Sequence, residues 1–133
     1  MAMSDRNVKA ARRWLEALSR EDFEAALALV HPDVELVPPG GHASYSGVES
    51  VRRWMEPDAF EANVVTPVEI VVAADRKILA RQHLRARGAG SGIELEGHSW
   101  SVWTFDDAGL ITRIEIYLDR EEDQAREAAG LSG

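Results

Sequence analysis

Cysteine is absent from this sequence. Its absence excludes a disulfide framework, a thiolate nucleophile and a zinc–thiolate site, and it is compatible with a reducing compartment. The four histidines show neither HxH nor HExxH spacing, and no glycine-rich phosphate loop follows a strand pattern. The sequence therefore predicts no metal site and no cofactor.

Long apolar runs and positive charge are also scarce. No run approaches the ~20 apolar residues of a membrane span, and the N-terminal segment MAMSDRNVKAARRW lacks the apolar core of a signal peptide. The net charge is −8, from 23 acidic and 15 basic residues, so the field of the protein repels phosphate backbones and anionic lipid. We expect a soluble, cytoplasmic protein that binds neither nucleic acid nor membranes.

One local basic run departs from this acidic balance. It consists of Arg81, His83, Arg85 and Arg87, at the spacing of one strand face. Acidic residues stand on the other predicted strands, at Glu69, Glu94, Glu96 and Glu115. Opposite charges on neighbouring strands favour each other, so we interpret the run as one half of a set of cross-strand ion pairs.

The chain does contain enough apolar material for one core. It has 133 residues, of which 45% are hydrophobic, and four of them are tryptophans. A chain of this size buries a core without metal or disulfide support. We expect a single domain, residues 1–133.

Residues 94–119 show the clearest pattern in the sequence. After Leu110, apolar and polar residues alternate with the period of two that is typical of a half-buried strand. The preceding segment Asp106-Asp107-Ala108-Gly109 predicts a tight turn, because aspartates bond their own backbone and Gly109 can adopt a positive φ. We therefore assign both aspartates a structural role rather than a catalytic one.

The front half of the sequence is helical. Apolar residues recur at helical spacing over residues 5–18. Phe23, Ala26, Leu27 and Val30 repeat that spacing, which predicts a second helix stopped near Pro32, with His31 in its last turn beside the free carbonyls. A short strand, residues 34–37, then ends at Pro38.

The remaining segments complete an α+β pattern. They are a helix at 47–56, strands at 64–73, 78–87 and 94–105, and a last helix at 120–129. Ser46 with Glu49 and Asp119 with Glu122 match helix N-terminal signatures, and Gly130 matches a helix stop. This order predicts a cone-shaped, strongly curved antiparallel sheet wrapped around the N-terminal helices and enclosing a pocket.

The order of elements, together with ALVHPDVELVPPGG, YSGVESVRRWM and the ending SVWTFDDAGLITRIEIYLDREEDQAREAAGL, resembles the SnoaL-like branch of the nuclear-transport-factor-two-like superfamily. The resemblance covers nearly the whole chain and implies a ketosteroid isomerase or polyketide cyclase-like fold. That superfamily contains isomerases, cyclases, hydrolases and binding modules, so the fold does not select the chemistry.

Two well-defined members of that superfamily provide tests. The resemblance to ketosteroid isomerase aligns its base and two oxyanion donors with Pro38, Trp14 and Ser101, of which proline accepts no proton. The resemblance to limonene-epoxide hydrolase aligns its Asp-Arg-Asp set with Ile116, Gln82 and Leu84. Neither mechanism has its ionisable groups here, whereas a SnoaL-like cyclase needs only one pocket acid or base.

The pocket residues depend on which side of each strand faces inward. The charge pattern of strand 78–87 turns Gln82 inward, the alternation after Leu110 turns Ile116 inward, and the resemblance favours an inward face with Ser99, Ser101 and Trp103. With Trp14 and Trp54 of the helices, these are the predicted pocket residues. A one-residue slip of strand 94–105 would instead turn His98 and Trp100 inward. The tryptophans also fit a plain core role.

His42 and Tyr45 are the candidate catalytic residues. Both lie in the loop PPGGHASYSG at the expected mouth of the cone, and functional groups concentrate on loops held by a rigid scaffold. Imidazole titrates near neutrality, although a solvated loop histidine is the competing interpretation of His42.

Two functional hypotheses follow. The first is a cofactor-independent acid–base enzyme acting on a small apolar, steroid- or polyketide-like molecule. The second is a non-catalytic module that binds such a molecule or dimerises. The outer sheet face, with Trp100, Val102 and Tyr117, suggests a homodimer.

Overall fold

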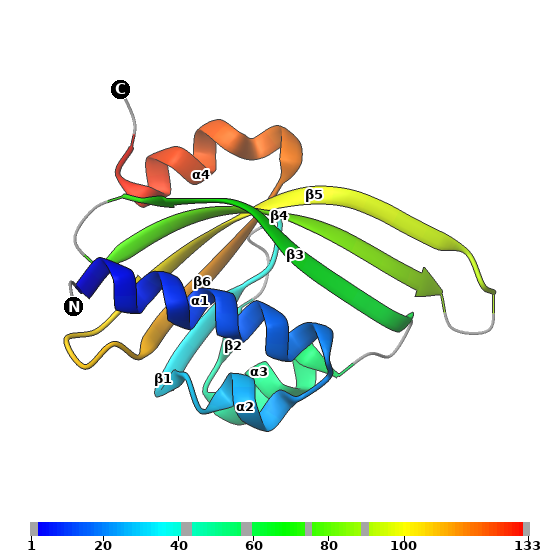
Figure 1. Cartoon of the computed structure of the whole chain (residues 1–133), viewed down its shortest axis with the longest axis horizontal. Coiled ribbons are helices and arrows are strands. Elements are labelled where there is room, and N and C mark those ends of the chain that lie inside the picture. Colours follow the sequence, from blue (N-terminus) through cyan, green and yellow to red (C-terminus); the bar gives the residue numbers. More distant parts are fainter. Residues whose placement is uncertain (1–2, 41–43, 57–59, 74–75, 89–90, 132–133) are drawn as a thin grey trace.

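The protein folds as a curled sheet with helices on both faces (Figure 1). The computed structural model describes residues 3–40, 44–56, 60–73, 76–88 and 91–131, with the side chains of residues 3, 4 and 60–63 left aside. The helices are α1 (Met3–Ser19), α2 (Phe23–Leu27), α3 (Val48–Met55) and α4 (Glu122–Ala129), the last preceded by a 3-10 turn (Asp119–Glu121). The strands are β1 (Val30–Val37), β2 (Tyr45–Ser46), β3 (Phe60–Val72), β4 (Lys77–Gly88), β5 (Glu94–Phe105) and β6 (Ile111–Leu118).

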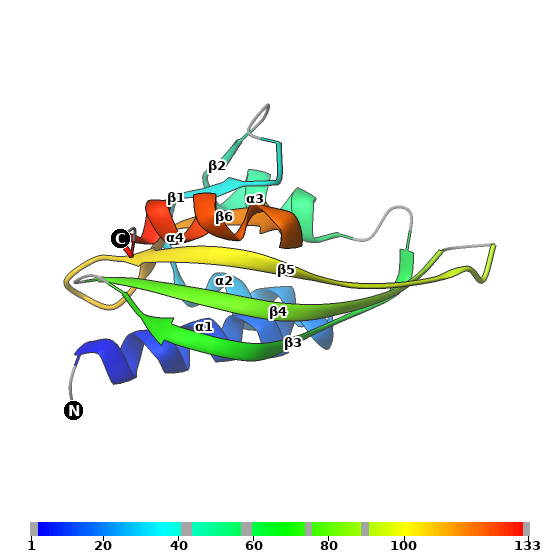
Figure 2. The ribbon, with the colours of Figure 1, turned by 90° about the horizontal axis from the view of Figure 1, so that it is seen from above.

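The six strands form one sheet in the order β2-β1-β6-β5-β4-β3. Strands β3 to β6 are a meander of antiparallel neighbours, as the sequence predicts. Strand β1 pairs with β6 in parallel, so one pair of the sheet departs from the predicted antiparallel arrangement. Seen from above, the long strands β3, β4 and β5 run side by side and extend past the helices (Figure 2). The predicted α+β cone is confirmed.

The sheet has two different faces. Its concave face covers α1, α2 and α3, while α4 lies on the opposite, convex face (Figure 1). The main core lies on the concave side, where Trp14, Trp103 and Phe105 are all at most 2% exposed. A smaller cluster lies on the convex side, where Ala125 and Ala129 of α4 pack over the sheet. None of the described helices is long and apolar enough to cross a membrane.

The turn between β5 and β6 has the chemistry that the sequence predicts. Asp106 Oδ1 accepts hydrogen bonds from the backbone N–H groups of Ala108 and Leu110, both at 2.9 Å. Gly109 adopts a φ of +87°, and the Arg6 side chain packs where a Cβ would project. Asp107 forms an ion pair with Arg76. Both aspartates therefore have structural partners, and the turn is fastened to the first turns of α1.

The second helix is shorter than predicted. Helix α2 ends at Leu27, and Val30 already pairs with Ile111 in the sheet. His31 is thus in β1 rather than in the last turn of a helix, and its Nδ1 accepts a hydrogen bond from the Asp33 N–H at 2.9 Å. The prediction was wrong because the parallel pairing with β6 takes up the residues that continue the helical spacing.

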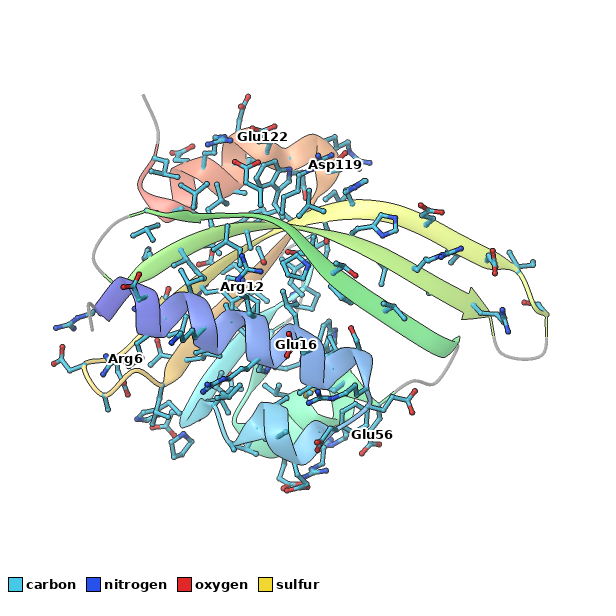
Figure 3. All side chains as sticks on the ribbon, viewed as in Figure 1. Arg6, Arg12, Glu16, Glu56, Asp119 and Glu122 are labelled. Atoms are coloured by element: carbon cyan, nitrogen blue, oxygen red, sulfur yellow. The ribbon has the colours of Figure 1, made fainter. Side chains whose placement is uncertain are left out.

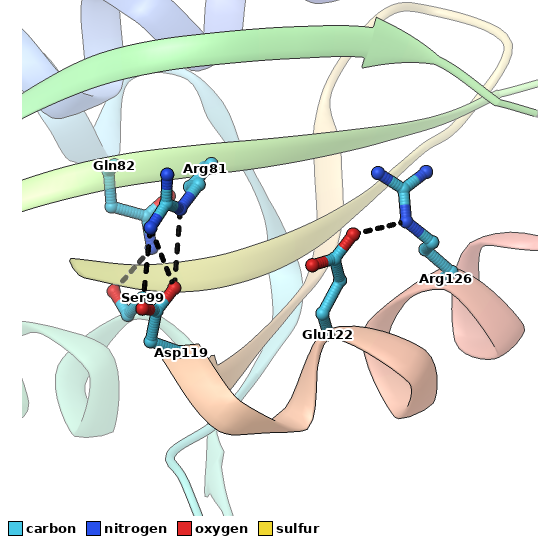
Figure 4. Close-up of polar contacts among 6 residues, drawn as sticks. All are labelled: Arg81, Gln82, Ser99, Asp119, Glu122 and Arg126. Atoms are coloured by element: carbon cyan, nitrogen blue, oxygen red, sulfur yellow. Dashed lines mark hydrogen bonds and ion pairs between the residues drawn. The ribbon is translucent and has the colours of Figure 1, made fainter.

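Two predicted helix signatures are also wrong. Gly47, with a φ of +89°, is the N-cap of α3 and no side chain caps that helix, so Ser46 and Glu49 form no capping box. Ser46 instead belongs to the short strand β2, which the sequence pattern did not reveal, and pairs with Glu35. Asp119 does not cap α4 but binds Arg81 (Figure 4).

The C-terminal helix changes the interpretation of the convex face. Trp100 is 3% exposed and Val102 is fully buried, because α4 packs over them. The guanidinium groups of Arg81 and Arg126 each lie over the Trp100 ring, at 5.7 and 5.4 Å from its centroid. Figure 3 places the labelled Asp119 and Glu122 on this side of the sheet. Two of the three residues predicted as a dimer interface, Trp100 and Val102, are therefore covered by the chain itself, and Tyr117 is half-buried.

Candidate functional site

The register of the strands decides which side chains face the helices. Gln82 pairs with Ser99 and Trp103 with Ile114, and Trp103 and Ile114 belong to the concave core. Trp100 and Val102 belong to the convex cluster. Ser99, Ser101 and Trp103 consequently face inward, as predicted, and the alternative register that turns His98 and Trp100 inward is excluded.

Four inward residues form a continuous hydrogen-bonded series, which we call the polar chain: Trp103, Ser101, Gln82 and Ser99. The Trp103 indole N–H donates to Ser101 Oγ at 2.7 Å. The Ser101 hydroxyl donates to Gln82 Oε1 at 2.9 Å, and Gln82 Nε2 donates to Ser99 Oγ at 2.8 Å. Figure 4 shows the link between Gln82 and Ser99, with the Arg81 pair on the other side of the same strand.

The polar chain has a fixed direction. An indole N–H can only donate, so Ser101 Oγ accepts from Trp103, and because the Gln82 amide turns its oxygen toward Ser101, the Ser101 hydroxyl donates to it. The amide group of Gln82 then presents its N–H groups to Ser99. Ser99 is half-buried, and no described residue accepts its hydroxyl hydrogen. The outer end of the polar chain is therefore a hydrogen-bond donor, and hydrogen bonds in series polarise one another.

Two further tryptophans, Trp14 and Trp54, extend from the Trp103 end of the polar chain. Trp14 of α1 contacts Trp103 edge-to-face, with centroids 5.3 Å apart, and stacks on Trp54 of α3 at 6.5 Å. Trp14 is 2% exposed, yet its indole N–H has no hydrogen-bond partner. A buried donor without a partner costs about 1–3 kcal/mol. The site thus holds a second donor that the described residues leave unsatisfied.

Asn7 is a buried polar residue of α1 that the sequence analysis missed. It is 2% exposed, and its Oδ1 also has no partner. Asn7 lies seven residues before Trp14, on the same face of α1. The signal that could have found it is a polar residue inside the apolar stripe of residues 5–18.

The other predicted site residues lie on the same side of the sheet. Ile116 pairs with Ser101 and packs, half-buried, on the concave core. Trp54 and Tyr45 are also half-buried against that core, and Tyr45 pairs with Leu36 of β1. His42 lies outside the described residues. Trp54, Tyr45 and Ile116 therefore pack on the concave core, and the polar chain lies on the same side of the sheet.

Three polar residues are buried among the described side chains, and all three are uncharged. They are Asn7, Gln82 and Ser101. The described part of the chain has no cluster of three or more His, Asp or Glu residues that could hold a metal ion. Chemically, this arrangement donates hydrogen bonds from a neutral, apolar surface.

On strands β4 and β5 the charged groups lie on the convex face instead. His83 Nε2 lies 2.7 Å from Glu96 Oε1, and this hydrogen bond lowers the pKa of the Glu96 carboxyl. Burial, together with a hydrogen bond to Glu115, raises the pKa of Tyr117 to about 12. Arg87 pairs with Glu94 at 3.5 Å, as the predicted cross-strand pattern requires. The two faces of β4 and β5 thus differ: the convex face carries the charged side chains, and the concave face makes the apolar contacts.

A curled α+β sheet over N-terminal helices, with polar side chains gathered on its concave face, defines a nuclear-transport-factor-two-like protein. The chain belongs to the SnoaL-like domain family, which matches residues 11–114. No curated protein matches the sequence.

Several solved structures share the fold. Rv0760c from Mycobacterium tuberculosis, in complex with estradiol-17β-hemisuccinate, has 22% identity and a TM-score of 0.75, over 86% of this chain and 94% of that chain. A putative polyketide cyclase from Xanthomonas campestris has 20% identity and a TM-score of 0.75, over 91% and 96%. TerC, co-crystallised with polyporic acid, has 21% identity and a TM-score of 0.74, over 88% and 94%. At these identities the likeness shows the fold alone.

Proposed function

We propose that this protein binds a small apolar molecule that carries a hydrogen-bond acceptor oxygen, such as a ketone or quinone carbonyl, on the concave face of its sheet. The observation that carries this proposal is the direction of the polar chain, which ends in a free donor at Ser99. The unpaired N–H of Trp14 is a second donor on the same side. Two neutral donors within an apolar surface match an acceptor oxygen on an otherwise apolar molecule.

The fold relatives support the class of ligand. Rv0760c is described in complex with an estradiol derivative, and TerC was co-crystallised with polyporic acid. Both ligands carry oxygen atoms on a largely apolar ring system. We transfer only this chemistry to the present chain, because the polar side chains that contact a ligand differ between members of one fold.

We propose binding rather than catalysis as the primary role. Proton transfer needs a group that changes its protonation state near the ligand, and the buried polar side chains of the described residues are an asparagine, a glutamine and a serine. The acid–base alternative rests on His42 and on Tyr45, whose half-buried ring lies on the concave side. If ligand turnover is observed and survives in a His42→Ala, Tyr45→Phe double variant, those two residues are not its catalysts.

The binding proposal is tested by titration with estradiol-17β-hemisuccinate and polyporic acid, followed by tryptophan fluorescence. We expect a change in emission, because Trp14 and Trp103 lie beside the polar chain. Ser99→Ala removes one donor and should weaken binding about fivefold, the equivalent of ~1 kcal/mol for one hydrogen bond.

The matched control is His98→Ala, which alters the neighbouring residue on the convex face and should leave affinity unchanged. Equal affinity in the wild type and in the Ser99→Ala variant would contradict the assignment of Ser99 as the donor. No binding of either compound, or of a neutral quinone, would contradict the proposed function.

Self-association is a separate proposal. Because α4 covers Trp100 and Val102, we restrict it to the exposed part of the convex face around His83 and His98, whose rings lie 5.0 Å apart. Sedimentation over a wide range of concentrations tests it. A single monomer mass throughout would contradict it.

A further inference from the structure

Beyond Ser99 and Gln82, strands β4 and β5 continue as an arm that separates charge from apolar surface. On its convex side stand charged and histidine residues, namely His83, Arg85, Arg87, Glu94, Glu96 and His98. On its concave side stand Leu84 and Ala86 of β4, facing Gly97 and Leu95 of β5. We call these four concave residues the apolar strip. Its first residue pair, Leu84 with Gly97, is the next pair on the same face after Gln82 with Ser99, and the register does not shift between these two pairs.

The two leucines of the apolar strip are open to solvent, whereas Ala86 is only 6% exposed. Leu84 is 38% exposed and Leu95 is 49% exposed. The ribbons of β4 and β5 extend past α1 and α3 (Figures 1 and 2), so these helices do not cover the far end of the strands. Exposed leucines that lie together on one face mark a surface to which apolar groups bind.

Gly97 stands in the middle of the strip and has no evident role in the fold. A Cβ added there would meet no atom within 4 Å, and the backbone does not have the positive φ that requires glycine. Glycine inside a strand weakens it and often marks a place where a ligand approaches closely. The open space over Gly97 is therefore better explained by a ligand than by internal packing.

We propose that the apolar strip holds the tail of the same molecule whose acceptor oxygen binds at Ser99, and that Gly97 determines which tails fit. This inference rests on the proposed function. The ligand is then an elongated molecule with a carbonyl-type oxygen at one end and an unbranched apolar tail. From Ser99 to Leu95 the strand spans four residues, or about 13 Å, which sets the length of tail that the strip covers.

Continuity favours this occupant over a second protein. The strip adjoins the donor end of the polar chain on the same face of the same two strands. The charged residues on this part of β4 and β5 all point to the opposite face of the sheet, where Glu94 pairs with Arg87 and Glu96 pairs with His83. On β4 and β5, a neutral tail that follows a neutral head meets no charged side chain along this face.

The test uses 1,4-naphthoquinones that carry a methyl, pentyl or nonyl group at position 2, titrated by tryptophan fluorescence. Complete burial of one methylene raises affinity roughly fourfold, and a strip that covers one side of the tail should give about half of that free energy, or about twofold per methylene. In the Gly97→Val variant the added side chain occupies the strip. We expect it to bind the methyl compound like the wild type and to lose most of the gain from the longer tails.

The matched control is His98→Val, which places the same side chain on the convex face and should keep the full dependence on tail length. Valine favours strands and meets no neighbour at position 97, so thermal unfolding should show that Gly97→Val is folded. If the wild type binds all three quinones equally, or if Gly97→Val keeps the dependence, the inference about the strip is overturned. If no quinone binds, the proposed function fails and this inference fails with it.

Sedimentation separates the tail from another occupant. We expect Leu95→Ser to leave the mass of the protein unchanged and to weaken only the long-tailed quinones. If instead the wild type is a dimer and Leu95→Ser is a monomer, the strip is an interface between two copies, and the inference is overturned.

Discussion

Replacing Ser101 by alanine tests whether the polar chain holds the site together. The Ser101 hydroxyl accepts from Trp103 at 2.7 Å and donates to Gln82 at 2.9 Å, and Ser101 itself is 1% exposed. Alanine leaves both partners buried and unsatisfied, and each such group costs about 1–3 kcal/mol. Water cannot easily replace the hydroxyl, because Trp103 is 1% and Gln82 is 5% exposed. We therefore expect the free energy of unfolding to fall by about 3 kcal/mol.

The assay is urea unfolding followed by tryptophan fluorescence, and the matched control is Ser99→Ala. Ser99 makes one bond of the polar chain, accepting from Gln82 at 2.8 Å, and it is half-buried. Its loss should lower the free energy of unfolding by no more than about 1 kcal/mol. A Ser101→Ala variant as stable as Ser99→Ala would refute the polar chain as a buried, connected unit.

Two further predictions concern the turn and the convex face. Gly109→Ala and Gly92→Ala should each lower the free energy of unfolding by about 1–2 kcal/mol, because both positions have a positive φ; an unchanged unfolding midpoint in either variant would contradict this prediction. The pKa of Tyr117 is raised from 10.0 to about 12, so its contribution to stability is complete below pH 10 and is lost as the pH rises toward 12. A tyrosinate absorbance titration should show that pKa fall in Glu115→Gln, and an unchanged titration would contradict the role of that carboxylate.

The sheet could be predicted from the sequence because its signal is local and repeated. Alternation over 94–105 and 110–118, with a turn of aspartates and glycine between, depends only on neighbouring residues. The second helix could not be bounded in the same way. Val30 fits a helical stripe, yet it pairs with Ile111, some eighty positions away, and the Ile111 N–H donates to the Leu29 carbonyl at 3.0 Å. Tertiary pairing overrode the local pattern there.

The candidate site was predictable residue by residue but not as a connected unit. Period two places Gln82, Ser99 and Ser101 on inward faces once one register is chosen. Their bonds depend on the pairing of Gln82 with Ser99 across two strands, which no local pattern states. The cover of Trp100 by α4 is likewise a contact between distant segments. Trp100, which the sequence alone predicted as part of a dimer interface, is therefore buried under α4.

The separation of charge between the two faces leads to a last prediction about salt. The protein carries a net charge of −8, yet the buried polar side chains of its described residues are neutral. A neutral quinone should therefore bind with the same affinity at all ionic strengths. The anionic estradiol-17β-hemisuccinate should bind more tightly at high salt, because the repulsive field is screened as the Debye length falls from about 10 Å at 0.1 M to about 3 Å at 1 M. If salt instead weakens the binding of the hemisuccinate and leaves the quinone unaffected, a cationic group lies at the site, and the acceptor oxygen is held by charge rather than by the neutral donors of the polar chain.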